Sequence, residues 1–460
     1  MKNVEHFGSS VVVRADDPSL TGTAGMVCVR ETVRALGLVD AIDGFVGPIK
    51  QRARGVTAGE LVVSLAECLL GGGDFLADLD RARADEVGAG LRSVAVPPAS
   101  TTAASLAARF GPDERAGVQV AWAEAIARAV GLLPVAERQR LVERVTVDAD
   151  PTDIEVYGAK KEGVAYNYCG QRSGRAFLVT WAELGVTLAA ELFAGNEDPR
   201  PVAADLVVSA LACLPAGLAK PAVRADAGFF DVNFVRAVLA AGADVAVGVK
   251  RNTAVVRAWR AIPADAWRPA EGMRGAEVAE AVYRPAGWPP VRAIVRRVRY
   301  DPDTISRDPR SRRRRTIDRD QLQLVIDGDA DHAYAYSMIL TTLTSDPVEI
   351  EAWFRGRVSI EDRIRDAKLG FGLRHLPSGK PAVNQLWLLA AVTALNLSTL
   401  TQALAATGPR AHAKRFRAEL LTIPGRVLRH ARQTVLRVPL GADHLVAAYR
   451  ALRALPSPAG

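Results

Sequence analysis

The sequence has few of the features that mark secreted proteins or proteins stabilised by structural zinc. It holds four cysteines in 460 residues (Cys28, Cys68, Cys169 and Cys213), and no two of them form a C-x-x-C pair. This pattern argues against a disulfide framework and against a structural zinc site. The first residues, from Met1 to His6, lack the apolar core of a signal peptide. We therefore expect a reducing, cytoplasmic compartment.

One uncharged run is long enough to span a bilayer. Leu386 to Ala406 is 21 residues without a charge. The run nevertheless contains six polar residues, five of them in its second half (Thr393, Asn396, Ser398, Thr399, Thr401 and Gln402). This polarity favours a buried core helix over a membrane span, and we expect no membrane partner.

Composition indicates a folded protein of two or three domains, because apolar residues make up 49% and charged residues 24% of the chain. The net charge of +8 is unevenly spread. Residues 251–320 hold 17 Lys/Arg against 9 Asp/Glu, and residues 407–460 hold 10 against 2, so each region carries +8 and the remainder −8. Two basic regions on an acidic body suggest a polyanion partner such as nucleic acid. An arginine-rich composition with solvated faces is the alternative.

The first 143 residues are predicted to form helices. Thr57 and Glu60 have the spacing of a capping box, and Gly71 to Gly73 end the apolar run that follows. This glycine run lacks the lysine and hydroxyl of a phosphate-binding loop. Two further helices are predicted, one capped by Ser100 or Thr101 and one over Pro112 to Val130.

From Val145 onwards, strand and helix patterns alternate as in an α/β fold. The predicted strands are 145–150, 165–169, 177–183, 186–193, 222–225, 244–249 and 336–343, and the predicted helices are 201–213 and 231–241. Residues 251–335 have a more irregular, β-containing texture that predicts an insertion. A long helix should open at Asp346-Pro347 and run past Lys368, and residues 407–460 are predicted to form short helices.

Two aspartates follow predicted strands. Asp150 ends an apolar strand before Pro151-Thr152, and Asp226 ends another before Ala227-Gly228. A carboxylate flanked by apolar residues is costly to desolvate unless hydrogen bonds or a cation compensate. Taken singly, each aspartate fits a turn or a helix cap better than a metal ligand.

A third acid lies on the predicted long helix. At 100° per residue, Phe354, Arg357, Glu361 and Lys368 share one narrow stripe. A separate apolar stripe packs the helix on a sheet (Ile360, Ile364, Ala367 and Phe371). Glu361 would then lie at the edge of the core with cations along its face. An amphipathic helix with an Arg357–Glu361 ion pair is the alternative.

Three carboxylates from two strands and a helix are typical of phosphodiester cleavage that uses divalent metal ions. Cleavage of a phosphodiester by two divalent ions needs anionic oxygen ligands that hold the ions about 3.5–4 Å apart. Mg²⁺ prefers carboxylate oxygens and keeps water and substrate phosphate as its other ligands.

The helix pattern Phe354-x-x-Arg357-x-x-x-Glu361-x-x-x-x-x-x-Lys368 resembles the Y-(2)-R-(3)-E-(6)-K signature of bacterial insertion-sequence transposases of the DDE class. Asp150-x-Thr152 and Asp226-x-Gly228-Phe229 are similar to the first and second acidic motifs of that family. The resemblance covers residues 145–400. It implies an α/β fold in which a ribonuclease-H-like core (144–250 and 336–406) is interrupted by a basic insertion (251–335). A helical N-terminal domain (1–143) would bind DNA ends, and a basic helical tail (407–460) would follow.

The resemblance also implies the site and the reaction. Asp150, Asp226 and Glu361 would be catalytic and would bind two Mg²⁺ or Mn²⁺ ions. Arg357 and Lys368 would contact transposon-end DNA, and Arg312, Arg313, Arg314 and Arg315 would neutralise phosphates. The activity would be hydrolysis at transposon ends followed by strand transfer into target DNA. The protein would act as a homodimer on double-stranded DNA, associated with the bacterial nucleoid. The alternatives are a nuclease of the same fold and a DNA-binding relic without catalysis.

Two positions depart from the family pattern. The family tyrosine is replaced by Phe354, so a phenol hydroxyl is absent there. Asp148 shares a strand face with Asp150, because residues i and i+2 point the same way. Asp150 is favoured as the first ligand by the Pro151-Thr152 that follows it.

Overall fold

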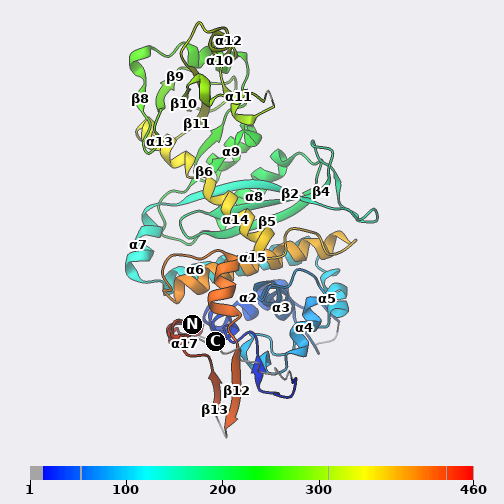
Figure 1. The fold of residues 1–460 in the computed structure, drawn as a ribbon. Coiled ribbons are helices and arrows are strands. Elements are labelled where there is room, and N and C mark those ends of the chain that lie inside the picture. The colour runs from blue at the N-terminus through cyan, green and yellow to red at the C-terminus, as the bar shows by residue number, and fades with distance from the viewer. Residues whose placement is uncertain (1–13, 52–53, 309, 431–432, 459–460) are drawn as a thin grey trace, which may run out of the picture.

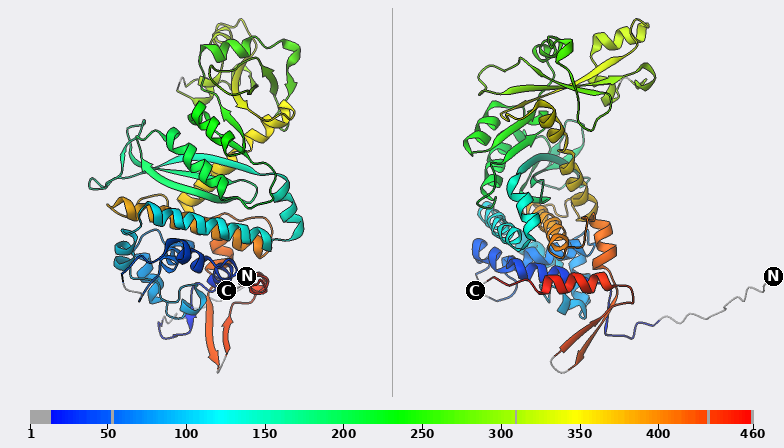
Figure 2. Two further views of the ribbon diagram at one scale, coloured as in Figure 1. Left: turned by 180° about the vertical axis from the view of Figure 1, so that it is seen from behind. Right: turned by 90° about the vertical axis from the view of Figure 1, so that its left-hand side faces the viewer.

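The computed structural model describes residues 14–51, 54–308, 310–430 and 433–458, and it does not describe the side chains of Pro199, Arg312 and Arg313. A central sheet separates a helical region built from both ends of the chain from a smaller region built from residues near 250–335 (Figure 1). The two further views show the same elongated order of parts (Figure 2).

The N-terminal region is helical apart from the short strand β1 (Leu20–Thr21), as far as the chain is described. The predicted capping box is confirmed: Thr57 Oγ1 accepts from the Glu60 amide at 3.2 Å, and Glu60 Oε2 accepts from the Thr57 amide at 3.0 Å. The predicted caps at Ser100 or Thr101 are wrong, because Ala99 is the N-cap and Ser100 is already helical. The helices are α1 (Met26–Leu36), α2 (Leu38–Val46), α3 (Ala58–Leu70), α4 (Asp78–Ala84), α5 (Ser100–Ala107), α6 (Pro112–Leu132) and α7 (Val135–Glu143).

Ten strands form one mixed sheet, in the order β3-β4-β2-β6-β7-β11-β10-β9-β8, with β5 also paired to β4. β2, β6 and β7 run parallel, whereas β4 and β5 are antiparallel additions at one side and β11 to β8 at the other. The bounds are β2 (Thr146–Glu155), β3 (Ala165–Tyr166), β4 (Arg172–Trp181), β5 (Val186–Ala194), β6 (Ala222–Ala225), β7 (Asp244–Gly248), β8 (Arg268–Pro269), β9 (Ala276–Ala281), β10 (Arg292–Tyr300) and β11 (Ala333–Thr341).

The chain between β7 and β11 extends this sheet. β11 pairs with β7 through Ile339–Thr341 and with β10 along its whole length, so the strand crosses the predicted boundary between residues 335 and 336. The helices of this part are α10 (Thr253–Arg260), α11 (Arg312–Thr316) and α12 (Arg319–Asp327).

The helix α15 (Pro381–Leu404) covers the outer edge of β5. It is long and apolar enough to cross a membrane, but 94% of its most apolar window is buried inside the protein. The amides of Asn396 and Gln385 each exchange two hydrogen bonds with the β5 backbone, at Thr187 and at Leu192. Polar side chains in this apolar helix therefore form hydrogen bonds with backbone N–H and C=O groups at the edge of β5 that would otherwise have no partner.

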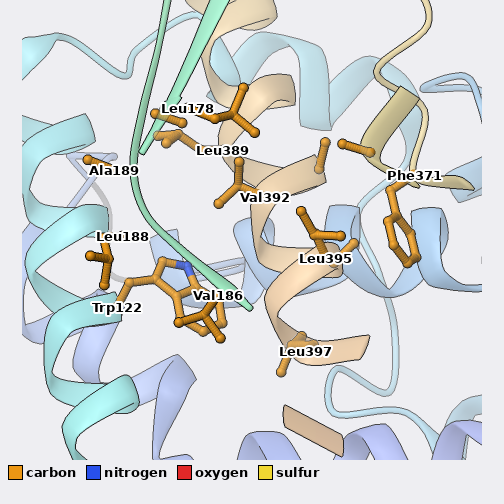
Figure 3. Close-up of a cluster of buried hydrophobic side chains, with 14 of the residues drawn as sticks. Trp122, Leu178, Val186, Leu188, Ala189, Phe371, Leu389, Val392, Leu395 and Leu397 are labelled. Atoms are coloured by element: carbon orange, nitrogen blue, oxygen red, sulfur yellow. The ribbon is translucent and has the colours of Figure 1, made fainter. Parts of the chain in front are cut away.

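Apolar side chains of α15 complete the core beneath the sheet. Leu389 and Val392 lie among residues of β5 and α6, including Val186, Leu188 and Trp122 (Figure 3). All of these side chains belong to the main buried cluster. The helices α8 (Pro199–Ala212) and α9 (Val232–Ala240) pack on the sheet, α8 on β2, β4 and β5 and α9 on β7.

The predicted long helix is wrong in one respect. It begins as expected: Asp346 Oδ1 accepts from the Val348 amide at 2.8 Å, and Pro347 is the first helical residue. The helix is broken at Gly356-Arg357 into α13 (Pro347–Arg355) and α14 (Val358–Gly370). Phe354 therefore does not share a continuous helical stripe with Glu361 and Lys368.

The last part of the chain is only partly helical. The short helices α16 (Ala413–Phe416) and α17 (Asp443–Arg453) match the expectation for this stretch. The strands β12 (Gly425–His430) and β13 (Gln433–Arg437), which form an antiparallel hairpin, correct it. β12 also pairs with β1, so the two ends of the chain share a small three-stranded sheet.

Candidate active site

Two predicted acids lie next to each other on paired strands. β2 and β6 are parallel, and Ala149 is opposite Ala225 at the end of their pairing. Asp150 and Asp226 are the next residues on the two strands, so both lie where the parallel pairing of β2 with β6 ends. β2 continues to Glu155, which corrects the expectation that its strand ends at Asp150.

Glu361 lies in the first turn of α14. Burial raises the pKa of Asp150 to about 6, Arg357 opposes this rise, and the negative charges of Asp226 and Glu361 add to it. The three acids therefore share one electrostatic environment. Their side chains are not gathered closely enough to form a preassembled metal site, and none is found elsewhere in the described residues.

The three acids differ in their contacts. Asp150 Oδ1 accepts from Arg357 Nη1 at 3.0 Å, and both side chains are less than one-fifth exposed. Asp226 Oδ1 accepts from the Gly228 amide at 2.7 Å, which begins a short 3-10 turn. The Glu361 carboxylate is exposed and has no hydrogen bond or ion pair with any residue that the structure describes.

The two predicted DNA-contacting cations of α14 are held by protein groups. Arg357 stands at the start of the helix and bridges to Asp150, as above. Lys368 Nζ donates to the carbonyl oxygen of Asp153 at 2.7 Å, and burial lowers the pKa of Lys368. Both cations thus clamp α14 onto β2, and their contacts with DNA stay a prediction.

Asp148 lies on the same strand face as Asp150 but in a different environment. It is fully buried, and Arg224 meets both of its carboxylate oxygens at 2.7 Å. The parallel register places Asp148 directly opposite Arg224. A bidentate arginine occupies the oxygens that a metal ligand would need. This supports Asp150 over Asp148 as the first ligand.

Sequence reasoning missed the role of Arg224, Trp353 and Gly356. Arg224 also lies over the Trp353 ring, 5.0 Å from its centroid, and donates to the Trp353 carbonyl oxygen. Trp353 Nε1 donates to Thr146 Oγ1 at 2.9 Å. A Cβ added at Gly356 would lie 2.8 Å from Arg224 Nη1 and 3.0 Å from the Trp353 carbonyl oxygen, so a side chain there would have to displace the arginine. The sequence signal for this arrangement was Arg224, a charged residue within an apolar strand, together with Asp148 in the neighbouring strand.

The arginine run 312–315 lies on α11, which is in a different part of the molecule from α14 (Figure 1). Arg314 Nη1 donates to the Ser306 carbonyl oxygen at 2.8 Å, and Arg315 is exposed. The predicted contacts of Arg312 and Arg313 concern side chains outside the described part of the chain.

Comparison with known proteins identifies the family. The model of the family described as "Transposase DDE domain group 1" matches residues 4–456. The chain therefore belongs to this family of DDE transposases, whose activity is polynucleotidyl transfer.

Solved structures give a weaker likeness. The "Cryo-EM structure of piggyBac transposase synaptic complex with hairpin DNA (SNHP)" is similar with a TM-score of 0.42 and 10% identity, over 86% of this chain and 79% of that chain. No curated protein matches the sequence.

Proposed function

We propose that the protein is a DNA transposase of an insertion sequence that hydrolyses a phosphodiester at each transposon end and joins the freed 3′-hydroxyl to target DNA. The observation that carries this proposal is that Asp226 and Glu361 both lie within electrostatic reach of Asp150. Asp150 and Asp226 directly follow the last paired residues of the parallel strands β2 and β6, and the negative charge of Glu361 raises the pKa of Asp150. Family membership supports the same reaction class.

The sheet supports a ribonuclease-H-like core. Its first strands lie in the order β5-β4-β2-β6-β7, with β2, β4 and β5 successively antiparallel and β6 and β7 parallel to β2. In such a sheet, ligands bind beyond the carboxyl ends of the parallel strands. Asp150 and Asp226 leave their paired segments at this end.

The donor set fits magnesium or manganese. Asp150, Asp226 and Glu361 offer only carboxylate oxygens, which hard divalent cations prefer. The acids repel one another, since Asp226 and Glu361 both raise the pKa of Asp150, and one arginine compensates for this repulsion. We propose that these three residues hold a pair of metal ions. When bound, such a pair activates the attacking oxygen and stabilises the leaving oxygen.

Two sets of contacts position the proposed metal ligands. Arg224 and Trp353 hold the break between α13 and α14, which directs Glu361 toward the strand ends. Arg357 forms an ion pair with Asp150. We infer that Arg357 turns from Asp150 to a DNA phosphate when the site assembles, because a guanidinium binds either anion bidentately. The protein would act as a homodimer that holds two ends, in the cytoplasm with the chromosome.

The test compares Glu361→Gln with Asp362→Asn. Both changes replace one exposed or half-exposed carboxylate of α14 by an amide, and Asp362 pairs only with Arg365 on the same helix, among the residues described. The substrate is duplex DNA from the two sides of the gene, with Mg²⁺ or Mn²⁺. We expect Glu361→Gln to lower the cleavage rate at least about a thousandfold and Asp362→Asn to change it less than about threefold.

End binding by gel shift should survive in both variants. Cleavage by Glu361→Gln at the normal rate would show that the third ligand is wrongly assigned. Joining of a pre-cleaved end to a plasmid separates a transposase from a nuclease of the same fold. Binding without any metal-dependent nicking by the unaltered protein would instead indicate a non-catalytic relic.

A further inference from the structure

The hairpin formed by β12 and β13, here called the basic ribbon, projects from the helical region (Figures 1 and 2). Its base is fixed in two ways: Leu20 and Thr21 of β1 pair with Arg426 and Gly425, and Val427 and Leu436 pack against the main core. Within the described chain, no other strand pairs with β12 or β13. The ribbon is thus an anchored two-stranded element with its outer part in solvent.

Arginines lie on both faces of the basic ribbon. Arg426 is opposite Arg437, and residues opposite each other in an antiparallel pair share a face. Like charges in this position destabilise a hairpin. Asp17 offsets only one of them, through an exposed ion pair of 2.8 Å with Arg426. Arg437 is exposed and meets no acid in the part of the chain that the structure describes.

The other face of the ribbon borders a hollow of about 420 Å³. Three arginines contribute to its lining: Arg429 of β12, Arg30 of α1 and Arg450 of α17. The lining contains no carboxylate, and Arg429 and Arg450 have no hydrogen bond or ion pair to any described residue. Arg30 donates to the Gly90 carbonyl oxygen. Three arginines around one hollow without a carboxylate are complementary to a phosphate group.

We propose that the basic ribbon is a DNA-binding element that enters a groove of duplex DNA, while Arg429, Arg30 and Arg450 hold a backbone phosphate at its side. A two-stranded ribbon is one of the elements that the major groove admits. This inference rests on the proposed function for its choice of DNA as the polyanion. It assigns a contact surface that is separate from the catalytic acids.

The test uses the full chain with Arg429→Gln/Arg437→Gln and a matched control, Arg274→Gln/Arg284→Gln. The control removes the same net charge from two exposed arginines of the region between β7 and β11, which have no partner in the described structure. Binding to a duplex of about 40 bp is measured by fluorescence anisotropy between about 50 and 200 mM NaCl.

We expect the ribbon variant to bind about tenfold more weakly at the lower salt. Its slope of log K against log salt should fall by about 1.8, which is the loss of two phosphate contacts. The control should keep the normal affinity and slope. Arg429→Lys/Arg437→Lys keeps the charges and should keep most of the slope. Unchanged thermal midpoints show that the variants are folded.

Equal weakening in the ribbon variant and the control, or no weakening in either, would overturn the proposal. Cleavage at saturating DNA separates this proposal from the proposed function. The ribbon variant should still nick DNA there, because its catalytic acids are intact. If the unaltered protein never cleaves yet the ribbon variant loses affinity, the ribbon proposal stands and the proposed transposase activity fails.

Discussion

The region between β7 and β11 and the C-terminal region carry the same net charge in sequence, but their antiparallel strands place the arginines differently. In the first region, all four arginines of β10 pair with carboxylates: Arg292, Arg296, Arg297 and Arg299. In the second, the hairpin of β12 and β13 pairs only Arg426 with an acid, Asp17, whereas Arg429 and Arg437 have no acidic partner among the described residues. Net charge alone therefore does not show which region can bind a polyanion.

The difference arises from register. β9 and β10 place glutamates beside arginines, such as Glu277 directly opposite Arg297, so the pairs form as the sheet forms. β12 and β13 place Arg426 opposite Arg437 instead. The first arrangement stabilises the fold, whereas the second leaves positive potential for a partner. Changes that convert one arrangement into the other test this comparison.

The largest expected effect is on stability, at the ion pair of Arg260 with Asp318 in the region between β7 and β11. Asp318 is almost fully buried, accepts from Arg260 at 2.7 Å and caps α12 through the Asp320 amide at 3.1 Å. Asp318→Ala should lower the free energy of unfolding by about 2 kcal/mol, because it removes a helix cap together with the buried half of an ion pair. Denaturant unfolding measures this loss, and DNA affinity should not change.

Asp320→Ala is the control for this prediction. Asp320 also meets Arg260 at 2.7 Å, but its side chain is 74% exposed. An exposed pair contributes little, so the control should be close to the unaltered protein. Equal destabilisation by both variants would contradict the view that Asp318 is the structural partner.

A smaller effect is expected at Arg297. Its guanidinium lies 4.2 Å from the centroid of Trp267 and 4.5 Å from that of Tyr334, and it pairs with Glu277. Arg297→Lys keeps the charge but loses the flat stacking surface, which should cost about 1 kcal/mol of unfolding free energy. Tryptophan fluorescence during unfolding reports the change. Arg274→Lys, at an exposed position, should have no effect, and an equal loss there would refute the stacking role.

Prediction from sequence succeeded where local patterns decide the structure. The capping box at Thr57 reflects contacts within a few residues, and the strands before Asp150 and Asp226 are visible in the local pattern of apolar residues. Prediction from sequence failed where contacts between residues far apart in the chain determine the structure. The helix break at Gly356 depends on Arg224, which lies far earlier in the chain and reaches the Trp353 carbonyl oxygen. The amides of α15 are explained only by the edge of β5.

The hairpin at 425–437 was missed for a related reason. Its strands contain leucine and arginine, which are as common in helices, and no Asn-Gly or Asp-Gly pair separates them in the sequence. Pairing with β1, from the opposite end of the chain, helps to fix the strand conformation. The charge of the segment could be counted from sequence, but its arrangement on two faces of a ribbon could not.

The smallest expected effect sharpens the comparison from the side of the ribbon. Asp17 is the one described acid paired with a ribbon arginine, through Arg426. Hydrogen bonds from Ser19 and the charge of Arg426 keep the pKa of Asp17 below its usual value, so it is ionised at neutral pH. Asp17→Asn should free Arg426 and tighten binding to duplex DNA by about twofold at low salt, with a steeper salt dependence. Asp16→Asn removes the same charge one residue away without a described ion pair and should have less effect. Equal tightening by both would mean that overall charge, and not the release of Arg426, governs binding at the ribbon.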